Sequence, residues 1–269
     1  MRWLLSLAVL VAFTLAPPLG EPVSAIPLPQ APQPSQESLA HFVVVELFTS
    51  EGCSSCPPAD AFLKRLDDTG RVGQVEVIAF EEHVDYWNRQ GWTDPYSSAE
   101  WTARQQRYAD YFRRDAIYTP QLVLNGTDQT SGNNERQVLA YLTRASTAPS
   151  AKVRISSLNV SAKSAEISVE LPNVGDEMKS AELWVAVTER GLSSNVLRGE
   201  NEGKTLTHAA VLRSLTRAHA RAGQNGSASA TARISLPLSW KRENLRFVVF
   251  LQQSKSLQIL GAATAAFPR

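Results

Sequence analysis

Unbroken apolar runs dominate the first half of the chain. Phe42–Phe48 and Val75–Phe80 are each apolar except for one glutamate, and Gln121–Leu124 is a shorter run that ends at an Asn125-Gly126 turn. Continuous apolar runs of this length, bounded by turn residues, are typical of strands that are buried on both faces. The first half therefore predicts a sheet that is covered on both sides.

Helical spacing appears between these runs. After Pro57, which suits a first helical turn, Phe62, Leu63 and Leu66 form one apolar face. A second helix is expected over Asn134–Arg144. Buried strands that alternate with amphipathic helices predict an α/β fold.

Beyond about Ala148 the pattern changes to alternating polar and apolar positions. Alternation with period two is typical of strands that have one solvent-exposed face. We expect a smaller, antiparallel β-sandwich-like domain over residues 148–269, with one short helix within Leu206–Ala220 and a hairpin turn at Ser254-Lys255-Ser256. The strands are expected at Lys152–Leu158, Ala165–Leu171, Glu182–Thr188, Ala230–Leu238, Leu245–Gln252 and Leu257–Ala263.

The N-terminus has the features of a secretory signal. Met1-Arg2 precedes the apolar run Trp3–Leu15, and Val23-Ser24-Ala25 has small residues at the spacing that signal peptidase requires. The run is shorter than the ~20 residues that span a bilayer, which weighs against a membrane anchor. We expect a signal peptide at 1–25, a flexible leader at 26–40, and a periplasmic or extracellular protein without a membrane span after cleavage.

Charge excludes one class of partner. The formal net charge is +1, with 27 basic and 26 acidic residues, so the chain lacks the electrostatic footprint of a nucleic-acid-binding protein. It also has no glycine-rich phosphate loop, and we expect no cofactor.

The two cysteines of the chain, Cys53 and Cys56, lie two residues apart after the first apolar run. A disulfide that closes so short a loop removes little entropy from the unfolded chain, which weighs against a structural staple. The N-terminus of the following helix would stabilise a thiolate at Cys53, the expected nucleophile. Cys56 would then attack Cys53 in a mixed disulfide and release the partner.

A Thr119-Pro120 step opens the third apolar run. A CxxC pair at a strand-to-helix junction, followed by Thr-Pro at the start of a later strand, resembles the thioredoxin fold. The resemblance implies that Pro120 is cis and lies beside Cys53. It also implies that the backbone of Thr119 is available to pair with an extended substrate.

Longer motifs narrow the resemblance. Together they are similar to a family of secreted bacterial thioredoxin-like proteins known mainly as a domain of unknown function. The resemblance covers residues 41–147, which we expect to form a thioredoxin-like domain, and it implies a fold and a compartment but no substrate. The motifs are ELFTSEGCSSCPPAD (Glu46–Asp60), HVDYW (His83–Trp87), GWTDP (Gly91–Pro95), RQQRYA (Arg104–Ala109) and YTPQLVLNG (Tyr118–Gly126).

Residues 81–114 form an insertion relative to the ordinary thioredoxin pattern. Its second part is expected to be a helix capped by Ser97 or Ser98, and its first part a structured, aromatic loop. In this loop Tyr86, Trp87 and Trp92 are candidates for a substrate platform near the redox edge. The alternative is that they form the small core of the loop itself.

Three titratable residues are further candidates. His83 and Asp85 could assist proton transfer, and Glu46 could accept a proton if it is buried in its apolar strand. Each has a structural alternative: His83 as a hydrogen-bonded core residue, and Glu46 as a solvent-facing residue. His208, in the second half, is expected to be structural or exposed.

Three classes of function remain open. The first is a thiol–disulfide oxidoreductase that uses Cys53 and Cys56 on a protein or small-molecule thiol or disulfide, together with an unknown redox recycling partner. The second is a protein that binds or delivers a soft ion such as Cu(I) through the two thiolates, with His83 as a further ligand. The third is a noncatalytic binding protein with a permanent disulfide.

Overall fold

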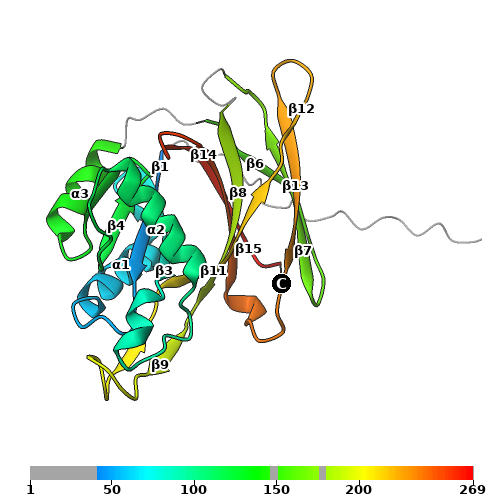
Figure 1. Cartoon of the computed structure of the whole chain (residues 1–269). Helices are drawn as coiled ribbons and strands as arrows, with labels where there is room; N and C mark the ends of the chain where they lie inside the picture. Colours follow the sequence, from blue (N-terminus) through cyan, green and yellow to red (C-terminus); the bar gives the residue numbers. More distant parts are fainter. Residues whose placement is uncertain (1–40, 146–150, 176–179, 269) are drawn as a thin grey trace, which may run out of the picture. The chain divides into compact units, whose positions relative to one another are not determined.

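The computed structural model describes residues 41–145, 151–175 and 180–268 (Figure 1). The expected signal peptide and leader therefore lie outside the described residues. Within the described ranges, no helix is long and apolar enough to cross a membrane.

The first half alternates strands and helices, as expected for an α/β fold. Its elements are β1 (Phe42–Thr49), α1 (Pro57–Thr69), β2 (Arg71–Val72), β3 (Val75–His83), the 3-10 helix η1 (Tyr86–Gln90), α2 (Ala99–Tyr111), β4 (Gln121–Leu124), β5 (Asp128–Ser131) and α3 (Glu135–Arg144).

The second half consists mainly of strands. Its elements are β6 (Arg154–Val160), β7 (Ser164–Leu171), β8 (Ala181–Arg190), β9 (Ser193–Asn195), β10 (Thr205–Thr207), β11 (Ala210–Ala218), β12 (Arg221–Ala222), β13 (Ala228–Ser235), η4 (Arg242–Asn244), β14 (Leu245–Gln253) and β15 (Ile259–Ala266).

One mixed sheet runs through both halves, in the order β15-β14-β8-β11-β3-β1-β4-β5. Strands β1 and β3 are parallel, from Phe42 opposite Glu76 to Thr49 opposite His83, and β4 is antiparallel to β1. A separate small antiparallel sheet has the order β12-β13-β7-β6. The fold class expected from the sequence, α/β with a smaller antiparallel β-part, is confirmed.

Side-chain alternation along β1 and β3 divides the core of the first half into two faces. Val43, Val45 and Leu47 point toward α1 and α3, together with Val77 and Ala79 of β3. The alternate residues pack against α2 and against strands of the second half. Because Glu81 and His83 continue the odd-numbered positions of β3, their side chains lie on the face that α1 covers.

The second half extends the same sheet instead of standing apart from it. In the described residues β11 pairs with β3 at one position, Val211 opposite Glu81, and continues antiparallel to β8. The small sheet packs on this extension, because side chains of β7 and β13 share one apolar core with those of β8, β14 and β15. Segments on both sides of residue 147 therefore contribute strands to one sheet, and the boundary at 147 stays a prediction.

The short helix expected within Leu206–Ala220 is wrong. This segment forms β10 and β11, and β11 pairs with β8 along most of its length. The spacing of apolar residues in this segment is compatible with either a helix or a strand. The segment is a strand because it pairs with β8, which is distant in sequence.

Both helices expected near the insertion and after the third strand are confirmed. Ser98 caps α2 by accepting a hydrogen bond from the backbone of Glu100, and Asn134 caps α3 by accepting one from Gln137. Strand β3 continues to His83, so the irregular part of the insertion begins at residue 84.

Candidate active site

The cysteines occupy the loop between β1 and α1 and form the Cys53–Cys56 disulfide. Two turn hydrogen bonds shape this loop: Cys53 N donates to Ser50 O at 3.1 Å, and Cys56 N donates to Cys53 O at 3.2 Å. Helix α1 begins at Pro57 with Cys56 as its N-cap residue, so Cys53 lies ahead of the helix and not in its first turn. Both cysteines have an exposed fraction of 0%.

Ser55 contacts the first sulfur directly. Its Oγ lies 3.3 Å from Cys53 Sγ. A disulfide sulfur carries no hydrogen, so the serine hydroxyl is the donor. After reduction the same hydroxyl can stabilise a thiolate at Cys53.

The peptide bond between Thr119 and Pro120 is cis, as the thioredoxin resemblance implies. Pro120 precedes Gln121, which lies opposite Phe48 near the end of β1, where the cysteine loop starts. Gly132 fits tightly between this proline and α1, because a Cβ at that position would lie 3.0 Å from Pro120 Cβ and 2.7 Å from Ala59 Cβ. The proline therefore lies next to the first turn of the helix that follows the cysteines.

The aromatic insertion borders the cysteine loop. A Cβ on Gly52 would lie 3.2 Å from Trp87 Cβ, and Trp87 Nε1 donates to Thr119 Oγ1 at 2.8 Å. Trp87 thus bridges the residue before Cys53 and the residue before Pro120. Tyr86 and Trp87 are both half-buried and pack against an apolar cluster that includes Phe48 of β1 and Tyr108 of α2, so these aromatic side chains join the insertion to the sheet.

A loop of the second half covers the cysteines from another side. Residues 196–204 connect β9 and β10, and Asn201 Nδ2 in this loop donates to Glu51 O and to Cys53 O, both at 2.9 Å. Ser54 N donates to Glu200 Oε2 at 3.0 Å. Nothing in the local sequence indicates these contacts, since Asn201 lies in a polar segment typical of any surface loop.

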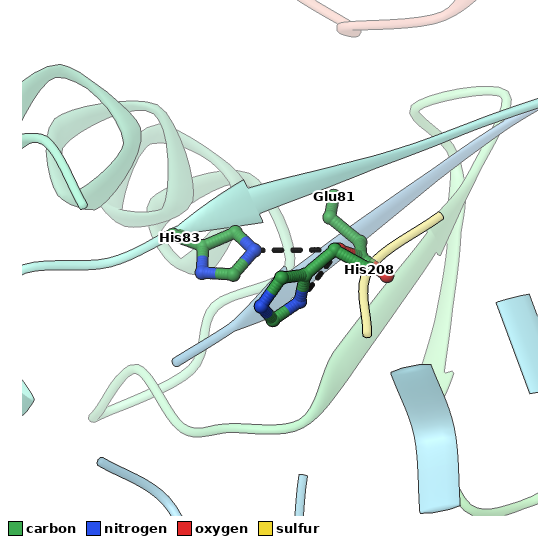
Figure 2. Close-up of side chains that lie close together, drawn as sticks. All are labelled: Glu81, His83 and His208. Atoms are coloured by element: carbon green, nitrogen blue, oxygen red, sulfur yellow. Dashed lines mark hydrogen bonds and ion pairs between the residues drawn. The ribbon is translucent and has the colours of Figure 1, made fainter. Parts of the chain in front are cut away.

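Five titratable residues meet behind the cysteine loop, and we call them the junction cluster: Glu51, Glu81, His83, Asp94 and His208. All five are buried. His83 Nδ1 lies 2.7 Å from Asp94 Oδ2, and His208 Nε2 lies 2.9 Å from Glu51 Oε1. Figure 2 shows one nitrogen of each imidazole turned toward the Glu81 carboxylate, and the two rings contact each other edge to face with centroids 4.7 Å apart.

The cluster connects the insertion, the cysteine loop and the second half. Glu51 N donates to Asp94 Oδ2 at 2.8 Å, Trp92 Nε1 donates to Glu51 Oε2 at 2.7 Å, and Ala209 N donates to Glu81 Oε1 at 3.0 Å. The predicted residue His83 is therefore part of a larger network. His208, expected to be structural or exposed, is buried.

In this cluster, ion pairing shifts the pKa values more strongly than burial does. Burial alone would lower the pKa of His208, but the neighbouring Glu51 and Glu81 carboxylates raise it to about 9. Burial also opposes the charge on His83, and the Asp94 carboxylate nevertheless raises the pKa of His83 well above its ordinary value. Burial would raise the pKa of Glu81, and the two imidazoles lower it to about 2. The neighbouring carboxylates therefore favour the cationic form of both imidazoles.

Asp60 in the first turns of α1 behaves in the opposite way. Its carboxylate is buried and accepts a hydrogen bond from Thr49 Oγ1 at 2.6 Å. Burial, together with the negative charge of Glu81, raises the pKa of Asp60 to about 7. This group therefore exchanges a proton near neutral pH beneath the cysteine loop.

Two of the predicted proton-transfer residues have other partners. Glu46 is buried on the α2 face of the sheet, where Arg104 Nε donates to it at 2.7 Å and Tyr108 Oη at 2.6 Å. Asp85 Oδ1 accepts a hydrogen bond from Thr102 Oγ1 at 2.6 Å, which joins the insertion to α2. These hydrogen bonds connect Glu46 of β1 and Asp85 of the insertion to helix α2.

A family model described as "Protein of unknown function (DUF1223)" matches residues 44–252 of the chain. The crystal structure of protein AGR_C_4864 from Agrobacterium tumefaciens is similar, with 28% identity, a TM-score of 0.59, and coverage of 89% of this chain and 97% of that one. HBP35 of Porphyromonas gingivalis shares the fold at 12% identity, with a TM-score of 0.60 and coverage of 86% and 76%. A search of curated proteins found no match.

Proposed function

The chain belongs to the DUF1223 family, and we propose that it is an exported thiol–disulfide oxidoreductase. The observation that carries the proposal is the Cys53–Cys56 disulfide in the loop between a parallel strand and helix α1 of a thioredoxin-like fold. A bridge across two intervening residues adds little to stability, so what this loop offers is reversible chemistry.

In the proposed reaction the reduced protein acts first through Cys53. Its thiolate attacks one sulfur of a substrate disulfide, forms a mixed disulfide and releases one substrate thiolate, which takes up a proton from water. The thiolate of Cys56 then attacks Cys53 Sγ and releases the second substrate thiolate. Two electrons pass to the substrate and the protein disulfide forms again, and the reverse sequence oxidises a dithiol.

The proposed substrate is a protein or small-molecule thiol or disulfide, and a second redox partner restores the starting form. The backbone of Thr119 beside Pro120 would pair with an extended substrate, next to Trp87 and Trp92. The position of Trp87 against Gly52, with its indole hydrogen-bonded to Thr119, supports this arrangement.

Counting free thiols in glutathione buffers tests the proposal. The purified chain, equilibrated across a series of reduced-to-oxidised glutathione ratios, should pass from zero to two thiols at a defined potential. A disulfide that stays closed at every ratio, even with the loop over it opened by mutation, would contradict a redox role.

Trapping tests the roles of the two cysteines. Cys56→Ser should accumulate mixed disulfides through Cys53, whereas Cys53→Ser should not. Trapping in the reverse variant alone would exchange the two roles. Export has its own check, because the mature protein recovered from the periplasmic or culture fraction should begin at Ile26.

A further inference from the structure

Each histidine of the junction cluster holds a carboxylate with one ring nitrogen and turns the other nitrogen toward Glu81 (Figure 2). His83 uses Nδ1 for Asp94, and its Nε2 lies 3.3 Å from Glu81 Oε2. His208 uses Nε2 for Glu51, and its Nδ1 also lies 3.3 Å from Glu81 Oε2. Metal-bound histidines in proteins have this arrangement, because a carboxylate on the outer nitrogen fixes the ring and its tautomer.

Two of the three pairs of inner atoms are spaced as ligands of one ion. Two atoms that each lie ~2.1 Å from a metal, at tetrahedral or octahedral angles, are about 3.0–3.4 Å apart. The two nitrogen-to-oxygen distances here are both 3.3 Å, and the three donor atoms lie within 4.8 Å of one another.

One of these atoms also lacks a hydrogen-bond partner. His208 Nδ1 is buried and makes no hydrogen bond of acceptable geometry to Glu81 despite its distance. Buried polar atoms are rarely left unpaired in native proteins. An ion held between the rings and the carboxylate would satisfy this nitrogen.

We propose that Glu81, His83 and His208 bind one divalent transition-metal ion. Two imidazoles and one carboxylate suit Zn²⁺ and Fe²⁺, whereas Ca²⁺ and Mg²⁺ prefer sites made of oxygen. Binding would displace any proton from the two ring nitrogens that face Glu81, because imidazole binds a metal ion through an unprotonated nitrogen.

The site joins two distant parts of the chain beside the disulfide. Glu81 and His83 end β3, His208 precedes β11, and Glu51, which holds His208, is two residues before Cys53. A bound ion would therefore fix the cysteine loop against the second half without touching either sulfur.

Zinc titration of the oxidised protein tests the site. The full chain is stripped with a chelator and then titrated with Zn²⁺ against a chromophoric competitor, with the disulfide intact. We expect one equivalent to bind, and His83→Gln and His208→Gln each to weaken binding by at least about 100-fold. His219→Gln, a change at an exposed histidine outside the cluster, should bind as the unaltered chain does.

The cobalt spectrum of the unaltered chain provides a second readout of the site, and a variant without the two cysteines serves as its comparison. Co²⁺ added to the unaltered chain should give d–d absorption without a sulfur-to-cobalt charge-transfer band, and the Cys53→Ser, Cys56→Ser double variant should give the same spectrum. Failure of the unaltered chain to bind one equivalent would overturn the proposal. So would binding that survives both histidine changes, or that needs the cysteines. The disulfide stays closed in the unaltered chain and is absent from the double variant, so no thiol–disulfide exchange takes place in either sample and none of these outcomes bears on the redox proposal.

Discussion

Asn201 donates a hydrogen bond to the backbone carbonyl of Cys53 at 2.9 Å, although the two residues are 148 positions apart. The same amide nitrogen reaches Glu51 O, and the neighbouring Glu200 accepts a hydrogen bond from Ser54 N. Both cysteines are fully buried, and we expect the loop of residues 196–204 to move before a thiol can reach either sulfur.

Asn201→Ala should make the disulfide easier to reach. The change removes two hydrogen bonds worth about 1 kcal/mol each, so an opening equilibrium that limits reduction should shift by about tenfold or more. The rate of reduction by dithiothreitol, followed by thiol counting, measures this. Glu202→Ala, at an exposed position of the same loop, is the control. Equal rates for both variants would mean that this loop does not limit access.

Ser55→Ala should slow the first thiol. A hydrogen bond to a charged group is worth about 1.5–3 kcal/mol, so loss of the hydroxyl should lower the reactivity of Cys53 at pH 7 about tenfold. Alkylation of the reduced chain by iodoacetamide, resolved by peptide mass, reports on each cysteine. Ser54→Ala leaves the contact with Sγ in place and should react as the unaltered chain does. A slowed Cys56 with an unchanged Cys53 would contradict the assignment.

Trp92→Phe should destabilise the protein by about 1–2 kcal/mol. It leaves the buried Glu51 carboxylate without the indole N–H that it accepts at 2.7 Å. Trp184→Phe is the matched control. Trp184 Nε1 is buried without a hydrogen-bond partner, so replacing this indole removes no hydrogen bond. Urea unfolding followed by circular dichroism compares the two. A larger loss for Trp184→Phe would refute this account.

Asp60 should make stability depend on pH between about 4 and 7. Its pKa is about 7 in the folded chain and 3.8 as an ordinary aspartate, because burial and the charge of Glu81 favour its neutral form. Between these values the folded state binds more protons, so this group's contribution falls as pH rises, by roughly 2–4 kcal/mol in all. Relative to the unaltered chain, Asp60→Asn should therefore gain stability as pH rises from 4 to 7. Chelator-treated samples unfolded in urea at several pH values measure this difference, and a constant difference would contradict it.

Short sequence features were sufficient to predict the strands and helices of the first half. The apolar run Phe42–Phe48, the Pro57 helix start and the cap at Asn134 each act within a few residues of the chain, and the structure has a strand or helix at each. The Thr119-Pro120 step was also visible as a motif, and its bond is cis.

The network around the cysteines was less accessible to sequence reasoning. His83 was visible because it follows an apolar strand, and the run Glu81-Glu82-His83 could have indicated buried charge at the end of that strand. His208 and Asn201 carry no such signal, because their contacts depend on β11 joining the sheet beside β3. Pairing between distant strands is not encoded in any short window of the sequence.

The junction of β11 with β3 also fixes an order of events during synthesis. The chain grows from its N-terminus at about 5–20 residues per second, so roughly 7–30 s separate the emergence of Cys53 from that of Asn201, 148 residues later. Throughout this interval the loop that supplies Glu200 and Asn201 does not yet exist. We therefore expect the thiol pair of newly made protein to be more open to an oxidant than that of the complete chain.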